Sequence, residues 1–131
     1  MARVLIVDDE RGYRHYLAQH LAREGHEVRS ASSRDEAIEV GAEFLPEVLI
    51  LDWMLNNAFD LEVAEALPEM DPDVRTILIT GFASEHARQE AVSVPIFRFI
   101  EKPFDMSDLS AAVRDALAAK ASIDAHPRRR R

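Results

Sequence analysis

The sequence contains no cysteine, and that absence excludes several kinds of chemistry. A chain without cysteine forms no disulfide, uses no thiol nucleophile and holds no metal through thiolates. Long hydrophobic runs are also missing: the longest, residues 4–7 and 48–51, fall far short of the ~20 residues that span a bilayer. The residues before Asp8 leave no room for the apolar core of a signal peptide. We therefore expect a cytoplasmic protein without a membrane span.

Basic residues are scarce over most of the chain. The 131 residues include 16 Lys and Arg against 24 Asp and Glu, a net charge of −8. Residues 1–120 hold only 12 of the basic residues against 23 acidic ones, whereas four arginines stand at 128–131. The excess of acidic residues in this part of the chain disfavours nucleic acid as its direct partner, because phosphate binding needs a basic face. The terminal arginines can contact nucleic acid or anionic lipid, although a solvated tail or the beginning of a linker is the commoner explanation.

The hydrophobic pattern alternates between strand-like runs and helical spacing. Four short, mostly apolar runs have the character of strands, residues 3–7, 48–51, 75–80 and 96–100, and residues 27–31 are also predicted as a strand. Each is followed by a segment with helical spacing, beginning near Tyr13, Ser33, Leu61, Ser84, and Asp105 or Ser107. Five strand–helix units predict an α/β fold, in which a doubly wound, five-stranded parallel sheet carries helices on both faces. We expect residues 1–120 to form this single domain and residues 121–131 to follow it as a basic tail.

Particular residues mark the ends of the first two helices. Gly25 stands where the first helix should stop. Ser33 and Glu36 have the spacing of a capping box at the start of the second helix. The second helix should then place Gly41 and Leu45 on its apolar side, together with Ala37 and Ile38, before Pro46 ends it.

Polar side chains follow four of the five predicted strands. Asp8 and Asp9 come after the first strand, Asp52 after the third, Thr80 after the fourth and Lys102 after the fifth. In open α/β sheets the ligand site lies beyond the carboxyl ends of the strands, so these side chains should meet at one edge. Three carboxylates in a small site repel one another unless a proton or a cation intervenes. Mg²⁺ suits such a site, because it binds through one or two carboxylates and leaves room for a phosphate.

The remaining groups of this set suit phosphoryl transfer. Lys102 supplies a positive charge, Thr80 a hydroxyl that can donate to a phosphoryl oxygen, and Asp52 a nucleophile that can carry an acyl phosphate. Each residue also has a purely structural explanation: the first two aspartates as helix caps, Asp52 as a turn residue, Thr80 as a strand end, Lys102 as a solvated loop charge. Those explanations give no reason for the groups to fall on successive strand ends.

At this point the chain resembles a known family, the receiver domain of bacterial two-component response regulators. The similarity runs from about Arg3 to Ala119. Its matching pieces are Val7-Asp8-Asp9-Glu10, Leu49-Ile50-Leu51-Asp52, Ile77-Leu78-Ile79-Thr80-Gly81 and Lys102-Pro103-Phe104. The resemblance implies a flavodoxin-like sheet with strand order 2-1-3-4-5.

The resemblance also implies a role for each acidic residue. Asp52 would accept a phosphoryl group from a sensor histidine kinase or a histidine phosphotransfer protein. Mg²⁺ would be held by Asp9, Asp52 and the backbone carbonyl of Met54, with Asp8 helping through a water. The protein would then be a signalling switch and no enzyme in the ordinary sense, although it would assist its own phosphorylation and dephosphorylation.

Other residues would bind the phosphoryl group and respond to it. By the same resemblance, Thr80, Gly81 and Lys102 would bind phosphoryl oxygens, while Thr80 and Phe99 would act as the switch. Their movement would change the face formed by the fourth helix and the fifth strand, and so control an output domain beyond Arg131, a separate effector or a phosphorylation-dependent homodimer. No membrane or nucleic acid partner is implied for this domain.

Some positions depart from the family's usual pattern. Asn56 and Asp60 stand where the family often has proline and glycine, so the path of the loop after the phosphoacceptor is open. By the same resemblance, the positions two beyond the phosphoacceptor and two beyond the threonine would flank the water that attacks the acyl phosphate, and here they are Met54 and Phe82. Neither carries a carboxylate or an amide to orient that water, and we therefore expect slow loss of the phosphoryl group.

Two other functions share parts of this pattern. A phosphatase of the haloacid dehalogenase type also uses an aspartate nucleophile with Mg²⁺, but it needs a second aspartate two residues later, where this chain has Met54. A pseudo-receiver would keep the fold as an interaction module without the chemistry. The presence of all five site residues argues against it, and the altered loop keeps it open.

Overall fold

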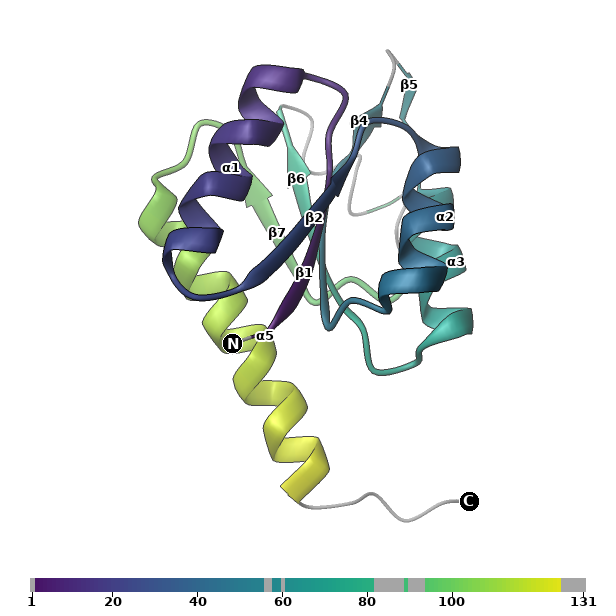
Figure 1. The fold of residues 1–131 in the computed structure, drawn as a ribbon, viewed down its shortest axis with the longest axis vertical. Helices are drawn as coiled ribbons and strands as arrows, with labels where there is room; N and C mark the ends of the chain where they lie inside the picture. The colour runs from purple at the N-terminus through teal and green to yellow at the C-terminus, as the bar shows by residue number, and fades with distance from the viewer. Residues whose placement is uncertain (1, 56–57, 60, 82–88, 90–93, 126–131) are drawn as a thin grey trace.

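A five-stranded parallel sheet forms the centre of the molecule (Figure 1). The computed structural model describes residues 2–55, 58–59, 61–81, 89 and 94–125. The strands of the sheet are β1 (Arg3–Val7), β2 (Glu27–Ala31), β3 (Val48–Asp52), β6 (Arg75–Thr80) and β7 (Arg98–Glu101). Their order is β2-β1-β3-β6-β7, with every neighbouring pair parallel. This confirms the predicted α/β fold and strand order 2-1-3-4-5.

Helices cover both faces of the sheet. The described helices are α1 (Arg11–Arg23), α2 (Arg34–Phe44), α3 (Glu62–Met70) and α5 (Met106–Ala125). Helices α1 and α5 lie on one face and α2 and α3 on the other, as Figure 1 shows. The helix expected over residues 84–92 lies outside the described residues, apart from Gln89.

The last helix continues past the boundary predicted at residue 120, since α5 ends at Ala125. Its C-terminal turns extend beyond the sheet (Figure 1). None of the helices in the described ranges combines the length and the apolar character that a membrane crossing requires.

The two faces of the sheet bury two separate hydrophobic cores. Alternate residues of a strand point to opposite faces, so Leu5 and Val7 join one core and Val4 and Ile6 the other. The first core lies under α2 and α3, and the second lies under α1 and α5. Strand β3 is buried along its whole length, including Asp52. The nearly continuous apolar runs in the sequence reflect this burial on both faces.

The helix ends partly follow the prediction. Gly25 adopts a left-handed φ of 98° after α1, as expected for a helix stop. Ser33 caps α2 by accepting a hydrogen bond from the Glu36 N–H at 3.3 Å. The return bond of the capping box is shifted, because Glu36 Oε1 accepts from the N–H and hydroxyl of Ser32 instead. These bonds lower the pKa of Glu36.

The prediction for Leu45 was wrong. This residue is the C-cap of α2, with a left-handed φ of 50°, and its side chain is 42% exposed. The helix ends one residue earlier than its apolar spacing suggests, because the chain must turn before Pro46 to enter β3.

A short antiparallel pair follows the central strand, where the sequence suggested only a polar loop. Strand β4 (Met54–Leu55) pairs with β5 (Ala58–Phe59), with Met54 opposite Phe59. Asn56 and Asp60, the two unusual positions of this segment, lie outside the described residues. Met54 lies two residues after the end of β3.

Candidate functional site

Asp52 and Lys102 form an ion pair at the carboxyl edge of the sheet. Asp52 ends β3 and is 7% exposed, and Lys102 directly follows β7. Lys102 Nζ donates to Asp52 Oδ2 at 3.1 Å. The Lys102 backbone N–H also donates to the Thr80 carbonyl oxygen at 2.7 Å, which fixes the lysine beside the end of β6. The fold thus brings together a cation and a carboxylate that are 50 residues apart in the sequence.

Asp8 is the second buried carboxylate of the site. It directly follows β1, the neighbour of β3 in the sheet, and is 2% exposed. Its Oδ1 accepts a hydrogen bond from the Glu10 N–H at 2.8 Å. Its Oδ2 is buried and makes no hydrogen bond to any residue that the structure describes. One face of this carboxylate is therefore available to a further ligand.

The surroundings of Asp8 disfavour its charged form. Its pKa is raised from 3.8 to about 6, and burial is the largest cause of this increase. The bond from Glu10 and the charge of Lys102 act in the opposite direction, while the charges of Asp52 and Asp9 add to the increase. Three carboxylates, those of Asp8, Asp9 and Asp52, thus interact at this edge with one cation, Lys102.

Thr80 supplies an unused hydroxyl at the end of β6. The residue is fully buried, and within the described part of the chain its Oγ1 has no hydrogen-bond partner. An unpaired buried hydroxyl costs free energy, on the order of 1–3 kcal/mol. Such a group at a strand end suits a ligand that offers an acceptor oxygen.

An aromatic side chain completes the surroundings of the lysine. The ring of Tyr13, on α1, lies 4.9 Å from Lys102 Nζ, close enough for a cation–π contact. Phe104 packs edge-on against Tyr13, with ring centroids 6.4 Å apart. Burial, together with the charges of Asp8 and Asp52, raises the pKa of Tyr13 to about 12, so the ring stays neutral.

Sequence reasoning placed Tyr13 only in the apolar stripe of the first helix and so missed this contact. The available signal was its position one helical turn after Asp9, on the helix that leaves the edge of the sheet.

The other predicted site residues lie in different surroundings. Asp9 is exposed, and Gly81 is exposed directly after β6. Phe99 is partly buried on β7, against the core under α2 and α3. The side chain of Met54 and the whole of Phe82 lie outside the described residues.

The sequence left open whether Trp53 packs in the core or lines the site. Its side chain is 2% exposed and belongs to the core under α2 and α3. Its backbone N–H donates to the Ile79 carbonyl at 2.9 Å, which ties the residue after Asp52 to the neighbouring strand.

The donor set fits a weakly liganded hard cation. Among the described residues, no three or more His, Cys, Asp or Glu side chains gather closely enough to hold a metal by themselves. Mg²⁺ needs less, because it keeps several waters and binds proteins through one or two carboxylates. The unpaired Oδ2 of Asp8, near the charge of Asp52, matches that requirement.

Comparisons with known proteins agree with this geometry. Residues 4–114 match a family model described as "Response regulator receiver domain". The chain is similar to sporulation initiation phosphotransferase F of Bacillus subtilis, at 25% identity over 92% of this chain and 97% of that protein. It is also similar to response regulator MprA of Mycobacterium leprae, at 31% identity over 94% of this chain and 54% of that protein.

A solved structure supports the same comparison. The crystal structure of a response regulator receiver domain protein from Clostridium thermocellum has a TM-score of 0.86 at 25% identity, covering 94% of this chain and 99% of that one. The chain spans only about a quarter to a half of the length of several other curated relatives that it matches.

The raised pKa of Asp8 predicts a pH-dependent stability. A carboxyl whose pKa is higher in the folded state favours folding when protonated, and that contribution is lost as the pH rises through about 6. Asp8→Asn keeps an acceptor for the Glu10 N–H and removes the charge. We expect it to raise the free energy of unfolding by roughly 2–3 kcal/mol above pH 6, and by much less below pH 4.

Urea unfolding across this pH range, in EDTA, measures the effect. Glu39→Gln, on an exposed position of α2, is the control and should change stability by less than about 0.5 kcal/mol. A destabilised Asp8→Asn variant at pH 8 would contradict the electrostatic account.

Proposed function

Because the chain belongs to the response regulator receiver domain family, we propose that it is a phosphorylation-dependent switch whose phosphoacceptor is Asp52. The observation that carries this proposal is the contact between Asp52 and Lys102, 3.1 Å apart beside the buried Asp8 at the carboxyl edge of the sheet. The phosphodonor is a sensor histidine kinase or a histidine phosphotransfer protein.

Asp52 acts as the nucleophile. One of its carboxylate oxygens attacks the phosphorus of a phosphohistidine, the P–N bond breaks, and the imidazole leaves with the bonding electrons and takes up a proton. Lys102 lies against Oδ2 and balances part of the charge that the incoming phosphoryl group adds. The ring of Tyr13 limits the directions in which the lysine side chain can turn away.

The acidic residues around Asp52 would hold Mg²⁺. Asp9, Asp52 and the Met54 carbonyl are the proposed direct ligands, and Asp8 contributes through a water. When bound, the cation neutralises charge on the transferring phosphoryl group. The charges of Asp52 and Asp9, which both raise the pKa of Asp8 in addition to burial, support this assignment, because a cation bound there would relieve their repulsion.

The phosphoryl oxygens bind to three groups at the edge of the sheet. Lys102 and the Thr80 hydroxyl donate to them, and the backbone of Gly81, exposed after β6, lies next to Thr80. The unpaired Thr80 Oγ1 supports this role, because a phosphoryl oxygen would give it the acceptor that it lacks. Movement of Thr80 would leave space for Phe99, the aromatic residue on the adjacent strand β7.

The switch would act through an output that the chain itself does not define. Candidates are an attached output domain, a separate effector and a phosphorylation-dependent homodimer. Relatives that are longer than this chain include proteins named as transcriptional regulators, which favours the first candidate.

Hydrolysis of the acyl phosphate would be controlled at Met54 and Phe82.

The phosphoacceptor is tested by labelling with a small phosphodonor. We expect one phosphoryl group on Asp52, formed only when Mg²⁺ is present, and no label on Asp52→Asn. Trp53, the only tryptophan, is next to Asp52 and should report Mg²⁺ and beryllofluoride by fluorescence. Mass spectrometry locates the label, and Asp35→Asn, on an exposed position of α2, is the control. Label that survives Asp52→Asn would refute the assignment.

The switch is tested by comparing the free and beryllofluoride-bound forms. Thr80 should move toward the mimic, and Phe99 should move inward, because Phe99 has no hydroxyl to hold it outward and only packing decides its rotamer. Structures of the two forms would measure both movements. Identical positions of Thr80 and Phe99 in the two forms would show that the signal leaves the site by another route.

The lifetime of the phosphorylated form depends on the groups beside the attacking water. Met54 and Phe82 offer neither a carboxylate nor an amide, so we expect slower phosphoryl loss than in receivers that have such groups. The variant with Met54→Asn and Phe82→Glu should lose its label roughly tenfold faster or more, since orienting the water lowers the barrier. A decay rate that the double change leaves unaltered would exclude control by these side chains.

A further inference from the structure

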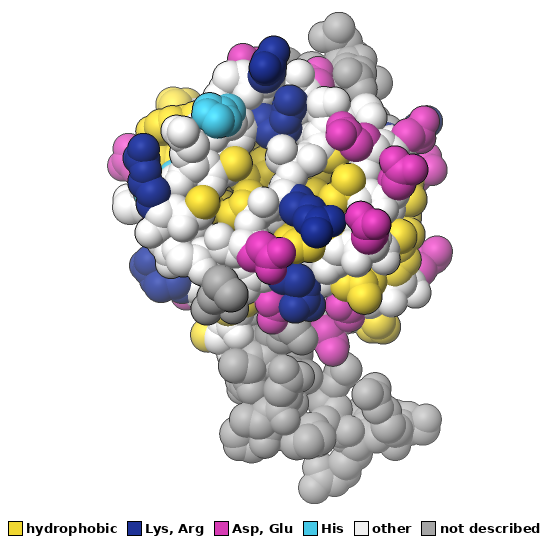
Figure 2. All heavy atoms as spheres, viewed as in Figure 1, with side chains coloured by type: hydrophobic (Ala, Val, Ile, Leu, Met, Phe, Trp, Pro, Cys, Tyr) yellow, Lys and Arg dark blue, Asp and Glu magenta, His cyan; other side chains and the backbone are white. Residues whose placement is uncertain are grey.

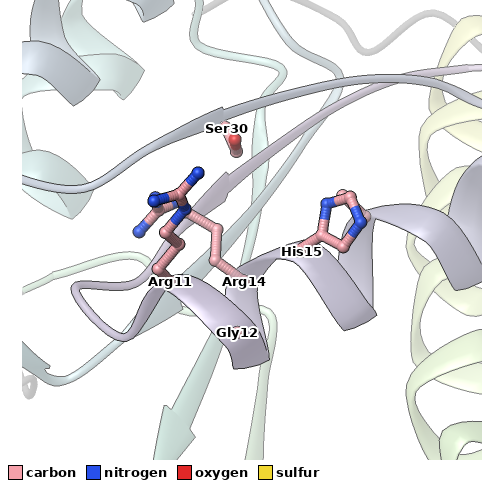
Figure 3. Close-up of a pocket in the computed structure, with 6 residues that line it drawn as sticks. Arg11, Gly12, Arg14, His15 and Ser30 are labelled. Atoms are coloured by element: carbon pink, nitrogen blue, oxygen red, sulfur yellow. The ribbon is translucent and has the colours of Figure 1, made fainter.

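A basic pocket lies between α1 and the edge strand β2, outside the site described above. It has a volume of about 420 Å³ and is lined by Arg11, Gly12, Arg14, His15, Ala18 and Ser30. Figure 3 shows both arginine side chains directed from α1 toward the same part of the pocket, with Ser30 above them on β2. Two arginines and a histidine thus line one pocket in a protein whose net charge is −8.

The positive charge of this pocket is only partly balanced within the molecule. Arg14 donates to the Asp8 carbonyl oxygen at 2.7 Å, and its charge helps to lower the pKa of Glu36. Arg11 and His15 make no ion pair or hydrogen bond with the residues that the structure describes. By contrast, Arg98 on β7 pairs with Asp115 at 2.7 Å.

The position of these cations on α1 is also unfavourable for the helix. The N-terminal end of a helix carries partial positive charge, which favours acidic side chains there. Helices α2, α3 and α5 all have acidic residues in the first turn, whereas α1 has none and begins with Arg11. Residues that destabilise the helix or strand to which they belong are expected at functional sites, such as sites that bind a ligand or a partner.

The backbone at the start of α1 is already satisfied. The Glu10 carboxylate accepts from the N–H groups of Gly12 and Tyr13, at 3.2 and 2.6 Å. The capacity of the pocket to bind an anion therefore lies in the side chains of Arg11, Arg14 and His15, together with the Ser30 hydroxyl on β2.

We propose that this pocket binds acidic side chains of a partner protein. Arg11 and Arg14 stand one helical turn apart, and Ser30 faces them from the edge of the sheet, so an acidic segment can engage several of these groups at once. Arg11 is exposed, and a single small anion gains little from an exposed guanidinium in water. One segment that makes several such contacts at once gains enough affinity to bind, whereas a single contact does not.

The surrounding charge favours one placement of such a partner. Figure 2 shows acidic side chains gathered on the α2 side of this face, and basic side chains with a histidine on the α1 side. An acidic segment is repelled by the first region and attracted by the second. The proposal does not depend on phosphorylation of Asp52.

The probe is a hexaglutamate peptide, titrated at low salt and in EDTA against the ¹⁵N-labelled full chain. Amide resonances of Gly12, His15 and Ser30 should shift together, and binding should weaken as salt is added. Arg11→Gln should lower the affinity about two- to fivefold, the loss expected for one such exposed charge contact. Arg23→Gln makes the same charge change in the last turn of α1 and should lower it less than twofold.

Two further measurements decide the outcome. Arg11→Gln should raise the Tm in the absence of peptide, because it removes a cation from the positive end of the helix; a lower Tm would make Arg11 a structural residue and overturn the proposal. Inorganic phosphate is titrated in parallel, and tighter binding of phosphate than of peptide at these resonances would overturn the choice of partner. The absence of peptide shifts at millimolar concentration, or equal losses in Arg11→Gln and Arg23→Gln, would overturn the site itself.

Discussion

The burial of two carboxylates at adjacent strand ends is the constraint on which the rest of the site depends. The sheet order makes β1 and β3 neighbours, so Asp8 and Asp52 must share one edge, and both are removed from water. Placing like charges there is unfavourable unless a cation or a proton balances them. Lys102 provides part of that balance at 3.1 Å from Asp52, while burial and, to a smaller extent, the charges of Asp52 and Asp9 still raise the pKa of Asp8.

Neighbouring residues hold Lys102 in position beside the two carboxylates. The Thr80 carbonyl anchors the backbone of Lys102, and the Tyr13 ring packs against its ammonium group. The Thr80 hydroxyl stays buried without a partner in the described part of the chain. A cluster that is short of a cation and also holds an unused donor is suited to bind Mg²⁺ and a phosphoryl group together.

Much of this arrangement could be predicted from the sequence, because the site residues stand at or directly after the ends of the strands. The apolar runs located β1, β3 and β6. The rule that parallel strands present their carboxyl ends at one edge predicted that Asp8, Asp52, Thr80 and Lys102 lie together. Contacts that depend on side-chain packing could not be predicted. Tyr13 looked like any residue of an apolar helix stripe, and the shift of the capping bond from Ser33 to Ser32 depends on how the chain enters α2. The left-handed turn at Leu45 is set by the entry into β3, which local spacing does not record.

The central claim is that Asp8, Asp52 and Lys102 form one electrostatic unit that lacks positive charge. The most direct test is the titration of the Asp8 carboxyl carbon by ¹³C NMR, in the wild type and in Lys102→Met, with and without Mg²⁺. The account predicts a pKa near 6 in the free wild type, a higher value in Lys102→Met because an attractive charge is lost, and a marked decrease in Mg²⁺. An Asp8 that titrates near its ordinary value of 3.8 in all three samples would contradict the account.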